Sequence, residues 1–166
     1  MEITSLARFI PYFENIRSRT MRVIGSIPRE QYDWRPAPGM FSFADLIRHL
    51  AAIERYMFCE NVQGLPSRYP GHGEELAKGP EEVLAYIERM HEESIAILKS
   101  LSDEDLSKPC TTPGGATMPR WKWLRAMIEH EAHHRGQIFM MLRMIGIGAA
   151  PLYGLTSEEV RDRSVV

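Results

Sequence analysis

The chain has 166 residues, of which 44% are hydrophobic and 25% are charged, and its formal net charge is −2. This length is typical of one domain, so we predict a single domain over residues 1–166, with a core large enough to fold without disulfide bonds. The near-neutral charge and the scattered basic residues argue against a nucleic-acid surface and against a basic membrane-binding face.

The sequence also lacks the features of an exported or membrane-spanning chain. No stretch approaches the roughly 20 consecutive apolar residues of a membrane span, and Met1–Thr4 lacks the basic start of a signal peptide. Cys59 and Cys110 are far apart and form no CxxC pair. We therefore expect two reduced thiols in a cytoplasmic protein that has no membrane partner.

Apolar residues recur at helical spacing over four long segments, and no β-strand alternation stands out. The first predicted helix covers residues 4–27, where Pro11 either kinks the helix or marks a start one turn later. The second opens at Ser42 and fades near Cys59. Asp45 lies three residues after Ser42, which is the spacing of a capping box.

The third predicted helix begins at Gly79-Pro80-Glu81-Glu82, because proline followed by acidic residues favours a helix start. The fourth covers residues 119–145, and a very short helix is expected after Thr156. Residues 60–79 form an aperiodic loop long enough to run back along the second helix. The second and third helices can then be parallel, as in all-α four-helix bundles with one long crossover.

Three of the six histidines lie within five residues of the fourth predicted helix. His130 and His134 are four residues apart, so both imidazoles project from one face and can chelate one metal ion. In a core they would otherwise need partners for both ring nitrogens. His49 faces inward from the second helix and is the natural third ligand, since catalytic zinc sites commonly have three protein ligands. The pattern predicts one divalent metal ion on His49, His130 and His134.

Other side chains near this motif are candidates for the surrounding pocket. Gln137 lies one turn beyond His134, on the ligand face, and can hydrogen-bond to the site. Tyr56 lies two turns beyond His49. His133 points about 100° away from its neighbour His134. We expect it at the flank, as a hydrogen-bond partner or as a residue at the mouth of the pocket.

Glu129 and Glu131 flank His130, but their spacing is not that of an HExxH motif. Glu131 is expected to project sideways onto a solvated face, with orientation of a ligand histidine or general-base catalysis as the alternatives. His91 is interpreted as a histidine at the rim of the bundle. For His72, in the long loop, we favour a solvated side chain and keep open a role as a lid over the metal.

The residues around the histidines resemble those of the DinB/YfiT-like metalloenzyme superfamily. The matching elements are His49-Leu50, His130-x-x-x-His134-Arg135-Gly136-Gln137, and Ile27-Pro28-x-x-x-x-Asp33-Trp34-Arg35-Pro36 followed by Ser42. The resemblance implies a four-helix bundle in up-down-down-up order, with a long crossover between helices 2 and 3. It also implies a divalent ion, often zinc or nickel, on three histidines, which correspond to His49, His130 and His134.

The resemblance further implies a homodimer that acts on a small-molecule substrate. Some members are transferases or isomerases that use a low-molecular-weight thiol, and others are metal-dependent hydrolases. We therefore expect a metalloenzyme that activates a thiol or water. The alternatives are a non-catalytic stress-response protein with a structural metal, and an interaction module with a degenerate site. A closed four-ligand site would favour a structural metal, and an open site would argue against it.

Overall fold

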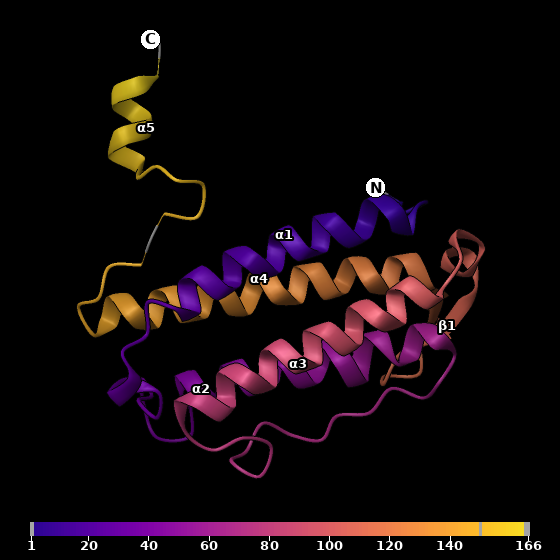
Figure 1. Ribbon diagram of the computed structural model, residues 1–166, viewed down its shortest axis with the longest axis horizontal. Helices are drawn as coiled ribbons and strands as arrows, with labels where there is room; N and C mark the ends of the chain where they lie inside the picture. The colour runs from indigo at the N-terminus through magenta and orange to yellow at the C-terminus, as the bar shows by residue number, and fades with distance from the viewer. Residues whose placement is uncertain (1, 150, 165–166) are drawn as a thin grey trace.

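The computed structural model describes residues 2–149 and 151–164. Four long helices lie along a common direction (Figure 1). They are α1 (Leu6–Ile24), α2 (Phe43–Ala52), α3 (Gly79–Ser100) and α4 (Arg120–Met144). A short antiparallel hairpin of β1 (Pro109–Thr111) and β2 (Thr117–Pro119) precedes α4, and the short helix α5 (Ser157–Arg163) follows it.

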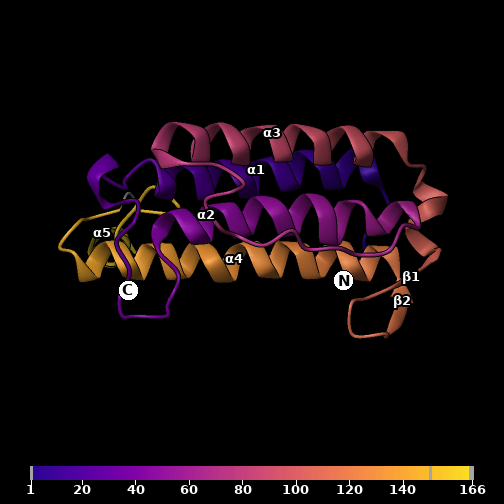
Figure 2. The same cartoon turned by 90° about the horizontal axis from the view of Figure 1, so that it is seen from below.

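The helices form the predicted up-down-down-up bundle. In Figure 1, α1 and α4 run from right to left, whereas α2 and α3 run from left to right. α1 packs against α4 and α2 packs against α3, and further contacts of α2 with α4 and of α1 with α3 close the bundle (Figure 2). Residues 64–78 return along the outside of the bundle, so the predicted crossover between α2 and α3 is confirmed.

A layer of polar and charged side chains divides the core into two apolar clusters. One cluster contains Ile24, Leu50, Ile87 and Leu142, and the other contains Phe13, Ile53, Leu98 and Leu124. Each of the four helical segments of the bundle carries one polar residue between the residues of the two clusters. These residues are Arg17 on α1, Glu54 after α2, His91 on α3 and Glu131 on α4.

The second predicted helix has the expected extent but changes its winding. α2 continues without a break into a π-helical segment, Ile53–Cys59, in which the Glu60 amide donates to the Arg55 carbonyl over 3.1 Å. The wider turn rotates the following residues relative to a regular α-helix, and such segments occur frequently at functional sites. Glu54 lies at the start of the segment and is buried.

The predicted capping box at the start of α2 is present. The Asp45 amide donates to the Ser42 hydroxyl over 3.1 Å, and the Ser42 amide donates to the Asp45 carboxylate over 2.9 Å. Because α2 packs against two helices, the Ser42→Ala variant should lower the free energy of unfolding by about 1 kcal/mol in denaturant titrations. Thr156 makes the same box on α5, which buries no residue. An equal loss from Thr156→Ala would contradict this expectation.

Two local features differ from the sequence-based expectation. α1 begins at Leu6 and continues through Pro11, so the later helix start that proline permitted is wrong. The hairpin of β1 and β2 lies between the third and fourth predicted helices although no β-strand alternation stands out in the sequence, because strands of three residues are too short to show alternation. The expected short helix after Thr156 is present as α5.

Over the described residues, no helix is both long and apolar enough to cross a membrane.

Candidate metal centre

Three histidine side chains converge between α2 and α4. His49 projects from α2, and His130 and His134 project from successive turns of α4. The Nε2 atoms of His49 and His130, of His49 and His134, and of His130 and His134 are each 3.1 Å apart. They form the one group among the described residues whose ligand atoms are arranged to hold a metal ion.

The donor arrangement fits a single divalent ion. Nitrogen donors about 2.0–2.1 Å from one ion lie about 2.9–3.4 Å apart at neighbouring octahedral or tetrahedral positions. The observed separation of 3.1 Å falls within this range. A neutral imidazole carries one N–H, so three Nε2 lone pairs meeting at one point repel one another unless a proton or a cation lies between them. The side chains present therefore suit a metal ion.

Burial favours the uncharged form of the histidines. Burial, assisted by the neighbouring imidazoles of His134 and His72, lowers the pKa of His49 to about 4. Burial and the imidazoles of His134 and His49 lower the pKa of His130 to about 3. The pKa of His134 is also lowered by burial, which outweighs its hydrogen bond to Gln137. All three imidazoles are thus neutral at pH 7, the form that binds metals.

Hydrogen bonds on the opposite side of the rings set the tautomer of two ligands. His134 Nδ1 donates to Gln137 Oε1 over 2.6 Å, which leaves the Nε2 lone pair of His134 free to face the centre. His49 Nδ1 lies 2.8 Å from the Tyr69 hydroxyl, and that hydroxyl lies 2.8 Å from His72 Nδ1. A hydroxyl can accept from His49 while donating to His72. This series of hydrogen bonds therefore also leaves the Nε2 lone pair of His49 free to face the centre.

The crossover that carries Tyr69 and His72 is fixed by an arginine next to a ligand histidine. Arg48 is 2% exposed, and its guanidinium donates to the His72 carbonyl over 2.7 Å and to the Ala77 carbonyl over 2.8 Å. The same group pairs with Asp45. His72 also packs against Phe41, with ring centroids 4.3 Å apart. His72 is therefore part of a cover over His49, the alternative that the sequence had left open.

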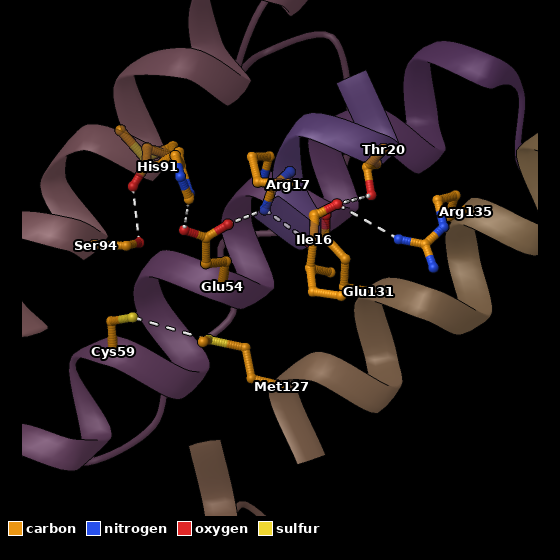
Figure 3. Close-up of polar contacts among 11 residues, drawn as sticks. Ile16, Arg17, Thr20, Glu54, Cys59, His91, Ser94, Met127, Glu131 and Arg135 are labelled. Carbon is orange, nitrogen blue, oxygen red and sulfur yellow. Dashed lines mark hydrogen bonds and ion pairs between the residues drawn. The ribbon is translucent and has the colours of Figure 1, made fainter. Parts of the chain in front are cut away.

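Glu131 lies in the core and not on a solvated face, so that prediction is wrong. It is 3% exposed and pairs with Arg17 over 2.9 Å, and Arg17 also pairs with Glu54 (Figure 3). The Glu54 carboxylate accepts from His91 Nδ1 over 2.9 Å. The physical reason is that α4 packs against both α1 and α2, so a side chain about 100° from His130 meets α1 instead of water.

His91 is a partner of Glu54 in this layer, and its protonation should affect stability. Burial and the Arg17 guanidinium lower the pKa of His91 to about 4. The unfolded chain therefore binds a proton at His91 below about pH 6.5, whereas the folded chain does so only near pH 4. Stability from this group is complete above pH 6.5 and is lost as the pH falls towards 4, by about 3 kcal/mol.

We expect the difference in unfolding free energy between wild type and His91→Gln to shrink by that amount from pH 7 to pH 4. The measurement is denaturant unfolding of the chelator-treated protein at each pH. The comparison of two proteins removes the contributions of the three histidines of the candidate centre, which both proteins share. A difference that does not change with pH would contradict the assignment.

Of the remaining candidates, His133 lies beside a histidine of the centre, whereas Tyr56 and Glu129 have other partners. His133 is exposed, with its ring centroid 4.9 Å from that of His134, as expected for a flanking residue. Tyr56 lies in the π-helical segment, where its ring packs against the guanidinium groups of Arg68 and Arg55 at 4.3 and 5.1 Å. Tyr56 thus belongs to a cluster of aromatic–cation contacts. Glu129 is exposed, at 3.4 Å from Arg125.

Neither cysteine is placed to act as a nucleophile. Cys59 and Cys110 are both free and buried. Burial raises the pKa of the Cys59 thiol to about 12, and burial also raises the pKa of Cys110. The Cys59 sulfur contacts the Met127 sulfur at 4.0 Å inside the bundle (Figure 3). Any thiol chemistry at the centre would therefore need a thiol from solution.

Sequence reasoning missed Tyr69, Arg48 and Arg17. Tyr69 lies in an aperiodic loop, where spacing predicts no contact, although an aromatic residue close to His72 was a possible signal. Arg48 and Arg17 carried a clearer signal, since each is a charged residue within or beside the apolar face of a predicted helix. Buried charges of this kind are usually paired. Arg17 pairs with Glu54, and Arg48 pairs with Asp45.

Comparison with known proteins agrees with this architecture. The family model of the DinB superfamily matches residues 12–138. The uncharacterized protein YjoA of Bacillus subtilis is 26% identical over 151 residues, which cover 88% of this chain and 94% of YjoA. The crystal structure of YjoA, a DinB-like protein, gives a TM-score of 0.67 at 21% identity, covering 84% of this chain and 92% of that one.

Two further solved structures share the fold. YfiT from Bacillus subtilis, described as a probable metal-dependent hydrolase with an unusual four-helix bundle topology, gives a TM-score of 0.68 at 16% identity and covers 88% of this chain and 90% of YfiT. A mutant of the mycothiol-dependent maleylpyruvate isomerase gives 0.66 at 15% identity. That alignment covers 81% of this chain and 60% of the isomerase. At these identities the likeness establishes the fold alone.

Proposed function

The chain belongs to the DinB superfamily, and on that basis we propose that it is a metalloenzyme whose divalent ion is held by His49, His130 and His134. The observation that supports this most strongly is the meeting of three Nε2 atoms at 3.1 Å from one another. Zinc or nickel is the expected ion, because the resemblance to the DinB/YfiT-like superfamily implies one of these metals and neutral imidazoles can bind both. Three protein ligands leave a position for a reactant, as catalytic sites require.

The proposed reaction is the activation of a thiol or of water. A divalent ion on three neutral imidazoles lowers the pKa of bound water to about 7, or holds a thiol as its thiolate. Gln137 and Tyr69 contribute by keeping the His134 and His49 rings in the tautomer that presents Nε2. Because both cysteines are buried, a low-molecular-weight thiol would be a co-substrate.

The comparisons support both versions of this chemistry. YfiT is described as a probable metal-dependent hydrolase, which is the water-activating version, and the maleylpyruvate isomerase is described as mycothiol-dependent, which is the thiol-activating version. We propose a small-molecule substrate in either case. The alternative is a metal that only joins α2 to α4, and a fourth ligand closing the site would favour it.

One experiment separates these possibilities. Protein purified without a histidine tag is stripped, loaded with Co²⁺ and titrated with a simple thiol such as ethanethiol. An open coordination position should give a thiolate-to-cobalt absorption band, and a closed structural site should leave the spectrum unchanged. Protein that takes up no Co²⁺ would refute the metal site itself. Assays of ester hydrolysis and of thiol addition to an electrophile then distinguish the two reactions.

A further inference from the structure

An apolar groove lies beside the metal centre. It is formed between the exposed face of α4 and the loop before α2, which pass close to each other in Figure 2. Its volume is about 580 Å³, within the range of small-molecule sites. Four of the ten methionines of the chain line it, and none of the described residues that line it is ionisable. These methionines are Met40, Met140, Met141 and Met144.

The groove adjoins the centre at two residues. Gln137 lines the groove and also accepts the hydrogen bond from His134 Nδ1. Phe41 lines the groove and packs against the imidazole of His49, with ring centroids 5.4 Å apart. On α4, Met141 lies two turns beyond His134 on the same side of the helix. The groove therefore extends the seam that carries the histidines.

We propose that this groove binds an uncharged alkyl or aryl arm of the ligand whose polar head reaches the metal centre. This inference rests on the proposed function and adds the class of substrate. Met140 is 62% exposed and Met144 60%, and leaving large apolar side chains in water is unfavourable unless a ligand covers them. Flexible, polarisable methionines adapt to apolar groups of varied shape. The lack of charge in the lining disfavours an anionic arm.

A small ligand fits these observations better than a second copy of the chain. The hollow has the volume of one small molecule, and its lining includes Gln137 and Phe41, which contact His134 and His49. A stable interface between two copies would bury about 1,200–2,000 Å² of total surface, of which this hollow could be only a part. We therefore assign the arm in the groove and the head group at the metal centre to one ligand.

The test uses Co²⁺-loaded protein and a series of straight-chain thiols from ethanethiol to hexanethiol. The thiolate-to-cobalt band reports binding of the head group, and its titration gives the affinity of each thiol. Burial of each added methylene in the groove should raise the affinity about two- to fourfold. In Met140→Glu, a charge at an exposed position of the groove should abolish this dependence on chain length.

The matched control is Tyr12→Glu, which adds the same charge at an exposed apolar residue of α1, outside the groove. It should retain the chain-length dependence of wild type. Equal affinities for all thiols in wild type, or an unchanged dependence in Met140→Glu, would overturn the groove proposal while the open metal site stands. No band with any thiol would overturn both proposals. A dimer that Met140→Glu dissociates in sedimentation would assign the groove to self-association and overturn the proposal.

Discussion

Replacement of His134 by alanine should lower the affinity for Zn²⁺ by about a hundredfold to a thousandfold. Structural zinc sites with four ligands bind with about 10–16 kcal/mol, so one ligand accounts for several kcal/mol. His134 is also the ligand whose Nδ1 is held by Gln137, which means that the substitution removes an oriented donor. Competition with a chelator of known affinity measures the change.

His133 provides the matched control for this experiment. It is the neighbouring residue on α4 and carries the same side chain, but it is exposed and is not one of the three converging donors. The His133→Ala variant should bind Zn²⁺ with the affinity of wild type. A similar loss in both variants would indicate that the affinity comes from a loose cluster of histidines, and it would contradict the three-ligand site.

The Arg17→Met variant should lose about 3–5 kcal/mol of unfolding free energy, because it leaves two buried carboxylates without their counter-charge. The side chains of Arg17, Glu54 and Glu131 are 5%, 3% and 3% exposed, and Arg17 contacts both carboxylates. The layer lies between two apolar clusters, which are built from residues of the bundle helices. Disruption of the layer should therefore affect the whole bundle. Denaturant unfolding at pH 7 measures the loss.

Two further variants test the cause of this loss. The triple variant Arg17→Met/Glu54→Gln/Glu131→Gln removes the uncompensated charges and should regain much of the lost stability. Arg125 pairs with Glu129 on the surface of α4, and Arg125→Met should cost less than about 1 kcal/mol. If Arg17→Met costs no more than Arg125→Met, the buried layer does not hold the bundle together.

The parts of the structure that follow from local periodicity could be predicted from the sequence. The i, i+4 spacing of His130 and His134 places both on one face of a helix whatever its neighbours are. The inward position of His49 follows from the apolar face of its own helix. The crossover follows from loop length and helix length, which restrict how the chain can return. Each of these inferences needs only residues that are close in sequence.

Features that depend on a distant partner could not be predicted in this way. Glu131 is 114 positions after Arg17, and nothing in its local spacing shows that α1 covers that side of α4. The contact of Tyr69 with His49 joins an aperiodic loop to a helix, where no periodicity applies. The π-helical segment Ile53–Cys59 packs against α3 and α4, which lie later in the chain. Patterns in the single sequence therefore predicted the convergence of the three histidines better than the side chains that contact them.

The sequence separation of the three histidines links ligand binding to the folding of the whole chain. His49 is 81 residues from His130 and 85 residues from His134, and α3 with the crossover lies between them. An unfolded chain retains only the His130–His134 pair at short range, so it offers two donors where the bundle offers three. An ion that prefers three donors acts as a long-range cross-link, and its free concentration should set the melting temperature.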